Sequence, residues 1–239
     1  LIGQTWSTFM DLDNLPETVD FNGPPGATFR RPVQARYTYN NPNLAKFQFA
    51  LEDPSDGARS PNLVARIDKA YDWGSMSARV LSHEQRMGGV SKRGMGLGLS
   101  GSYKITGTTT LMAQYTLMDG DNDGAYLVGA NYPVVDGSTL RLDRAQGVVL
   151  GLANVFSEKL RGTVSMGWVR SRNRLGDAYV SAYGDTGNLR LFQWHAGMYY
   201  TPIKNVELGT ELLGGRRTTF GGATGNMTRL NLQARYLFN

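Results

Sequence analysis

Hydrophobic and polar residues alternate along most of the chain, in segments of roughly ten residues. The pattern is clearest over 96–105, where Leu97, Leu99 and Tyr103 share one face and mostly glycine and polar residues occupy the other. Residues 230–238 repeat it, with a hydrophobic residue at every second position. Because successive side chains of a strand point to opposite faces, a period of two predicts β-strands. We expect an all-β protein with strands near 1–9, 32–40, 44–53, 62–72, 75–85, 94–105, 108–118, 125–133, 138–143, 146–157, 160–172, 189–201, 205–218 and 227–238.

The connections between these segments are alternately short and long. Short turns are expected at 41–43, 72–74, 106–107, 157–159 and 202–205, and longer polar or glycine-rich loops at 54–61, 86–93, 119–124, 173–188 and 219–226. This alternation describes an antiparallel up-and-down meander whose two ends differ. Outer-membrane barrels have this asymmetry, with short periplasmic turns and longer extracellular loops.

Three features favour a transmembrane barrel over a soluble all-β binding module, which remains the alternative. Many predicted strands reach the roughly 9–11 residues that a tilted strand needs to cross a bilayer. Aromatic residues such as Tyr71, Trp73 and Tyr200 gather near strand ends, as they do at membrane interfaces. The polar face also carries too many charges for a dry core. These charged residues are Arg36, Lys46, Glu52, Arg66, Asp68, Arg79, Lys104, Glu207, Glu211 and Arg235.

The composition excludes several other classes of protein. The 239 residues contain no cysteine, which excludes disulfide scaffolds, thiol catalysis and cysteine-ligated metal sites. The most apolar run, 148–156, is shorter than the roughly 18 residues of a transmembrane helix. The net charge of +5 is spread without a run rich in lysine or arginine, so nucleic acid is not an expected partner.

The first 38 residues carry the most specific signal in the chain. The runs GQTWSTFMD (3–11), LPETVDFNGPPG (15–26) and FRRPVQARY (29–37) closely resemble the DcaP-like porins of Gram-negative outer membranes. The C-terminus is similar to the assembly signal of outer-membrane barrels, although Asn239 follows the aromatic Phe238 that usually ends the family's chains.

The resemblance implies a homotrimeric, water-filled barrel in the outer membrane that passes small anionic solutes, with dicarboxylates as suggested substrates. It implies surroundings of outer-membrane lipid and lipopolysaccharide, and no cofactor. Residues 10–30 are expected to form an inward-folded constriction loop within one barrel domain, 1–239. The roughly fourteen predicted strands are expected to belong to a porin of about 16–18 strands whose N-terminal strands are missing from this sequence, or else to form a complete smaller barrel.

Charge at the constriction governs selectivity in such a channel. In the constriction loop, negative charge comes from Asp11, Asp13, Glu17 and Asp20. The expected basic residues of the wall are Arg30, Arg31, Arg36, Lys46, Arg66 and Arg79. Opposed acidic and basic rows would guide a dianion along the arginines, which bind carboxylates bidentately, and we predict a modest anion preference. Alternatively, the charges only keep the lumen solvated, or Arg30 and Arg31 anchor the loop through its own acids.

Two further motifs are weaker candidates for chemistry. Asp119, Asp121 and Asp123 resemble the first half of a calcium loop, but Ala130 replaces its terminal glutamate, and a polar extracellular turn is the alternative. His83 lies between Ser82 and Glu84, and neighbouring strand residues point to opposite faces, so they cannot converge as a catalytic triad. His195 is expected to line the lumen. We therefore expect a channel and not an enzyme, with an outer-membrane barrel hydrolase as the rival.

Overall fold

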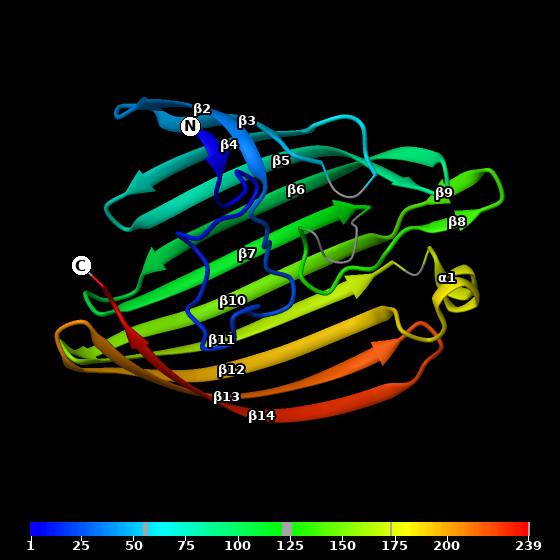
Figure 1. Cartoon of the computed structure of the whole chain (residues 1–239). Helices are drawn as coiled ribbons and strands as arrows, with labels where there is room; N and C mark the ends of the chain where they lie inside the picture. The colour runs from blue at the N-terminus through cyan, green and yellow to red at the C-terminus, as the bar shows by residue number, and fades with distance from the viewer. Residues whose placement is uncertain (55–56, 121–125, 173, 239) are drawn as a thin grey trace.

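A computed structural model of the chain describes residues 1–54, 57–120, 126–172 and 174–238. Twelve strands form one antiparallel sheet in which each strand pairs with its neighbours in chain order (Figure 1). The strands of this sheet are β1 (Ile2–Gln4), β2 (Val33–Asn41), β3 (Ala45–Glu52), β4 (Asn62–Tyr71), β5 (Gly74–Met87), β6 (Val90–Lys104), β7 (Thr109–Asp119), β10 (Arg144–Ser157), β11 (Leu160–Ser171), β12 (Asn188–Ile203), β13 (Val206–Thr219) and β14 (Thr224–Tyr236). A separate hairpin is made of β8 (Val134–Asp136) and β9 (Thr139–Arg141), and the helix is α1 (Gly176–Tyr183).

The up-and-down meander with unlike ends is confirmed. Short turns join the strands at one end of the sheet, and the longer loops, the β8–β9 hairpin and α1 gather at the other end (Figure 1). The sheet curls, and within the described residues β1 and β14 form its two edges. Among those residues, no helix combines the length and the apolar character needed to cross a membrane.

The two faces of the sheet differ as the alternation predicts. On the outer face, Leu99, Leu152 and Val164 are 46%, 42% and 60% exposed. On the inner face, Gln114 and Thr116 are 3% and 0% exposed, because other parts of the same chain cover them. A soluble protein would bury the aliphatic face, so this arrangement is that of a barrel whose outer surface meets lipid.

Five predicted elements differ in the structure. The longer loop expected at 86–93 is a two-residue turn, because β5 continues to Met87 and β6 begins at Val90. The strand expected at 125–133 is wrong: Tyr126 and Leu127 are buried inside the curl of the sheet, where Leu127 forms a single bridge with Thr28. The segment at 138–143 contributes only β9, outside the main sheet. The strand expected at 1–9 ends at Gln4, after which the chain turns inward. The loop 173–188 contains α1, whose Tyr179 is buried against the β8–β9 hairpin region.

Candidate functional site

A long segment near the N-terminus lies inside the curl of the sheet, next to Tyr126 and Leu127 of the loop after β7. This inner segment (residues 5–31) begins after β1 and ends before β2, and these two strands pair with each other, so the segment is a closed loop (Figure 1). The backbone N–H of Ser7 donates to the carbonyl of Arg30 at 2.9 Å, which brings its two arms together. A polar backbone of this length can lie inside a membrane protein only where protein or water satisfies its hydrogen bonds.

Asp11 attaches the inner segment to four strands of the wall. Its carboxylate lies 3.1 Å from Nη2 of Arg66 on β4 and 3.4 Å from Nη1 of Arg79 on β5. It also accepts a hydrogen bond from Ser100 on β6, and its backbone carbonyl accepts one from Gln114 on β7 at 3.0 Å. Asp11 is 1% exposed, so it faces the wall and not open water.

The ion pairs of Asp11 determine its protonation. Burial raises the pKa of the Asp11 carboxyl, but the guanidinium groups of Arg66 and Arg79 outweigh this effect and hold the pKa below its ordinary value of 3.8. The carboxylate therefore stays charged at neutral pH, and its attraction to both arginines is retained.

Glu52, at the end of β3, holds the first turn of the inner segment. Its carboxylate accepts hydrogen bonds from the Ser7 hydroxyl at 2.8 Å, from the Thr8 backbone N–H at 2.7 Å and from the Tyr126 hydroxyl at 3.1 Å. All four residues are buried. Glu52 thus joins the inner segment, the wall and the loop after β7 in one buried network.

The far end of the inner segment is tied to the last strands of the sheet. Arg161 on β11 donates two hydrogen bonds to Glu17, at 2.9 and 2.7 Å. Glu211 on β13 accepts the backbone N–H groups of Val19 and Asp20 at 3.0 and 3.1 Å. The Asp20 carboxylate also pairs with the guanidinium of Arg229 on β14. The inner segment is therefore fixed to both halves of the curled sheet.

Glycines on the inner face let the segment approach the wall backbone. A Cβ at Gly151 would lie 2.4 Å from Cβ of Pro16, and one at Gly167 would lie 2.3 Å from the carbonyl oxygen of Pro25. A Cβ at Gly147 would meet Gly26 at 2.7 Å. Any side chain at these positions would displace the inner segment from β10 or β11.

The interior near the loop end of the sheet is packed with apolar side chains. Phe9 of the inner segment is fully buried and meets Tyr126 edge to face, with ring centroids 5.9 Å apart. The other buried members of this cluster are Ala50, Val64, Leu81, Met118, Leu127, Ala130, Ala145 and Val169. The sequence predicts an inner face that lines water, whereas this part of the inner face is a small apolar core, because Phe9 and the residues around Tyr126 pack against it.

A polar hollow of about 240 Å³ remains between the inner segment and β2–β4. Arg36, Lys46 and Arg66 reach it from three successive strands, and Trp6 and Asp13 line it from the inner segment. Nε of Arg36 is buried and has no hydrogen-bond partner within the described residues. The hollow thus combines several cations with an aromatic ring, a set of groups suited to a small carboxylate.

Comparison with known proteins identifies the family. The chain matches the family described as DcaP outer membrane protein over residues 1–238. The chain belongs to the DcaP family. Its structure is similar to the outer membrane channel DcaP of Acinetobacter baumannii, with a TM-score of 0.88 and 29% identity over 99% of this chain and 71% of that one.

More distant solved structures share the fold of this DcaP-family chain. The trimer form of OmpT from Vibrio cholerae has a TM-score of 0.64 at 14% identity, covering 98% of this chain and 75% of that one. The anion-selective porin from Comamonas acidovorans has a TM-score of 0.62 at 12% identity, covering 98% and 67%. No curated protein matches the chain. The protein is therefore a transmembrane β-barrel of the channel and porin class, located in a Gram-negative outer membrane.

The structure brings only some of the expected basic residues together. In this DcaP-family chain, Arg36, Lys46 and Arg66 share the hollow, whereas Arg79 is 1% exposed beneath Asp11. Arg30 and Arg31 do not point at the acids of the loop. The guanidinium carbon of Arg30 lies 4.7 Å from the ring centroid of Tyr126, and that of Arg31 lies 4.9 Å from Trp6.

Most of the acidic residues expected at the constriction bind the inner segment to the wall. Asp11, Glu17 and Asp20 pair directly with wall arginines, and Asp13, with a side chain 73% exposed, is the one that stays open to solvent. The sequence pattern does not single out their wall partners Arg161 and Arg229. Both lie on predicted strands, but the sequence gives no indication of where along the sheet the inner segment passes.

The remaining candidates are placed as follows. His195 is 1% exposed, and its Nδ1 lies 3.4 Å from Glu211 under the inner segment. His83 is also buried, with Nδ1 2.9 Å from Nε2 of Gln85. Asp119 pairs with Arg144 at 2.6 Å. The other two residues of the calcium-like motif, 121 and 123, lie outside the described residues, so calcium binding stays a prediction.

Proposed function

We propose that this DcaP-family protein is a passive diffusion channel for small hydrophilic solutes, with a modest preference for anions and with dicarboxylates as its solute class. The observation that supports the proposal is the polar hollow lined by Arg36, Lys46 and Arg66. The inner segment lies across the interior beside it, and we infer that this segment is the constriction.

The balance of charge at the hollow supports a weak anion preference. Arg66 contacts three carboxylates, those of Asp11, Asp13 and Asp68, and Lys46 contacts Asp68 at 3.3 Å. Arg36 pairs with no carboxylate within the described residues. The lining of the hollow therefore holds three cations, Arg36, Lys46 and Arg66, and the single carboxylate of Asp13, while Asp11 and Asp68 offset part of this charge from outside the lining. A small excess of positive charge in a narrow wet passage favours anions without excluding cations.

The test is the reversal potential of the purified protein in planar bilayers under a KCl gradient. Arg36→Glu should move the reversal potential toward the value of a cation-preferring pore and weaken current block by a dicarboxylate. Lys204→Glu, which makes the same charge change in the turn before β13, is the matched control and should leave both unchanged. An unaltered reversal potential in the Arg36 variant would contradict the proposal.

We further propose that the channel is a homotrimer. The similarity to a structure described as the trimer form of OmpT supports this assembly, as does the resemblance of the opening segment to trimeric porins. Single insertions into a planar bilayer should then open in three equal steps. Insertion events with one conductance level each would contradict a trimer.

A further inference from the structure

Three arginines lie together on the outer face at the loop end of the sheet. This outer arginine patch consists of Arg170 on β11, Arg190 on β12 and Arg216 on β13, and all three are exposed. Each lies an even number of residues from an outward apolar side chain of its own strand, such as Met166 or Phe192. The patch therefore continues the lipid-facing surface toward the long loops.

The register places these charges side by side. Arg170 is directly opposite Arg190, and Phe192 is directly opposite Arg216, so that Arg216 lies diagonally across from Arg190. Like charges in opposed positions of neighbouring strands destabilise a sheet unless a counter-charge lies between them. The described residues supply no such counter-charge, because no ion pair or hydrogen bond reaches any of the three guanidinium groups.

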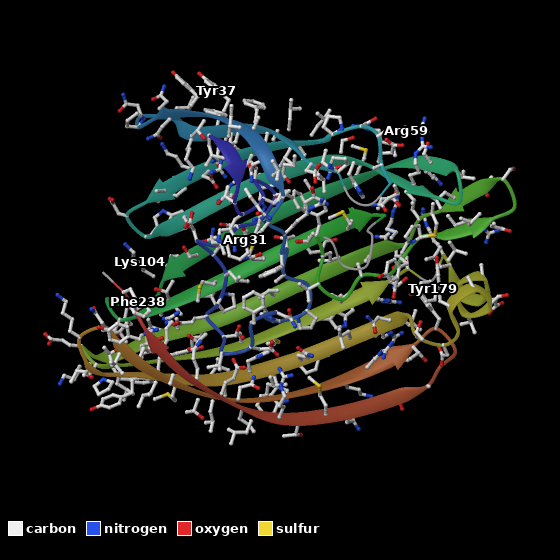
Figure 2. The ribbon with its side chains drawn as sticks, viewed as in Figure 1. Arg31, Tyr37, Arg59, Lys104, Tyr179 and Phe238 are labelled. Carbon is white, nitrogen blue, oxygen red and sulfur yellow. The ribbon has the colours of Figure 1, made fainter. Side chains whose placement is uncertain are left out.

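Several other cations at the ends of the strands have partners within the protein. At the short-turn end, Lys69, Lys104 and Lys159 donate to backbone carbonyls of neighbouring turns at 3.3, 3.1 and 3.4 Å. Figure 2 shows Lys104 at this end and Arg59 and Tyr179 at the loop end. Near the outer arginine patch, Arg144 pairs with Asp119. The patch differs from all of these in lacking a partner from the chain.

The position of the patch identifies the kind of partner. In outer-membrane barrels the long loops are extracellular, so the patch lies at the level of the outer leaflet headgroups. Exposed apolar residues such as Met166 and Trp194 continue below it along the same strands. Guanidinium groups bind phosphate bidentately. A ligand that fits has phosphates at the patch and acyl chains along the strands.

We propose that the outer arginine patch binds the phosphate groups of a phosphorylated glycolipid of the lipid A type in the outer leaflet. The phosphates supply the counter-charge that Arg170 and Arg190 require, and the acyl chains lie on the apolar rows below. This site is separate from the permeation pathway, because its side chains are on the opposite face of the sheet.

The experiment measures binding of fluorescent bis-phosphorylated lipid A to the protein folded in detergent. A variant with Arg170→Gln, Arg190→Gln and Arg216→Gln should bind at least tenfold more weakly. The matched control removes three charges from the other end of the sheet, with Lys104→Gln, Lys159→Gln and Lys204→Gln, and should bind within twofold of the unaltered protein. Heat modifiability on gels verifies that each variant is folded.

Two further measurements separate the possible ligands. The first measurement uses lipid A stripped of its phosphates. It should bind the unaltered protein as weakly as bis-phosphorylated lipid A binds the arginine variant. In the second measurement, 10 mM inorganic phosphate should not displace bis-phosphorylated lipid A from the unaltered protein. A triple Arg→Lys variant, which keeps the charge, should recover part of the affinity. Equal binding of phosphorylated and stripped lipid, full displacement by inorganic phosphate, or loss of oligomers without loss of lipid binding would each overturn the proposal.

Discussion

At the scale of single residues, Asp11 shows how one buried carboxylate positions a long segment. It contacts residues from four consecutive strands, β4 to β7, and two of these contacts are to arginines. A charge so deeply buried is tolerated only when it is paired. Its removal therefore leaves Arg79, itself 1% exposed, without its counter-charge.

We predict that Asp11→Asn destabilises the folded protein by about 3–5 kcal/mol, the range measured when one partner of a buried ion pair is removed. The inner segment should also become mobile, seen as added current noise in single-channel recordings. Asp13→Asn is the control, since its side chain is 73% exposed and lies 3.8 Å from Arg66. Equal thermal stability of the two variants would contradict this role for Asp11.

The protonation of Asp11 gives a pH dependence with a definite sign. The pKa of Asp11 lies below 3.8 in the folded protein and near 3.8 in the unfolded chain. Its ion pairs therefore stabilise the folded protein fully above pH 3.8, and this stabilisation is lost as the pH falls through the lower pKa of the folded state. Current noise should therefore rise reversibly below pH 3.8. In Asp11→Asn the noise should be present at every pH, and an acid response of the same size in that variant would assign the effect to another group.

The residues that line the hollow, and those that bind the inner segment to the wall, can be predicted from the sequence only in part. Sequence alternation places Arg36, Lys46 and Arg66 on one face of the sheet, and the structure brings these three together. It does not give the pairing of Glu17 with Arg161, 144 residues apart, because that contact depends on the path of the inner segment. The sequence therefore predicts that the loop acids supply negative charge at the constriction, whereas three of the four are paired with arginines of the wall.

At the scale of elements, glycines in the wall position the inner segment as much as ion pairs do, because they let its backbone approach the strands. Gly147, Gly151 and Gly167 form a smooth surface on β10 and β11 against which Pro16, Pro25 and Gly26 lie. A strand glycine has no side chain to pack and allows close approach of another backbone. Here the backbone that approaches is that of the inner segment.

We predict that Gly151→Ala pushes the inner segment away from β10, because the new Cβ would lie 2.4 Å from Cβ of Pro16. The expected results are a loss of about 1–3 kcal/mol of stability and a lower single-channel conductance, since the segment moves toward the water. Gly107→Ala, in a turn where no atom lies within 4 Å, is the control and should change neither quantity. Unchanged conductance in the Gly151 variant would show that the segment does not limit the current.

The elements that sequence reasoning missed have a common physical cause. Residues 126–130 are apolar because they cover Phe9 inside the sheet, and their composition resembles that of a strand. Helix α1 has no side-chain cap, and its buried Tyr179 packs on Phe220 and on the β8–β9 region. Both depend on tertiary contacts that a local pattern does not contain.

At the scale of the whole molecule, the rows of aliphatic side chains on the outer face of the sheet identify the protein as a membrane barrel. The eight long strands β4 to β7 and β10 to β13 alternate between exposed apolar residues and covered inner residues, and this alternation is present in the sequence. The register followed from the short turns, which leave little freedom in strand pairing. The family comparison and the exposed outer face lead to the same conclusion, a barrel in the outer membrane.

We predict that a charge on the outer face is tolerated only near its ends. Leu99→Arg, in the middle of a lipid-facing row on β6, should cost about 2–4 kcal/mol in a bilayer, whereas Ile105→Arg, in the turn after β6, should cost about 0–1 kcal/mol. Denaturant titrations in lipid vesicles measure both. Equal costs would mean that this face does not contact hydrocarbon.

The glycine surface beneath the inner segment has a consequence for how such channels diversify. The glycines are hidden from passing solutes, whereas Arg36 and Lys46 line the hollow. Replacing a hidden glycine by alanine alters the width of the passage while the lining charges stay the same. Exchanging a lining arginine for a neutral side chain of similar length alters the charge with little change in width. Width and ion preference can therefore evolve along separate mutational routes in one scaffold.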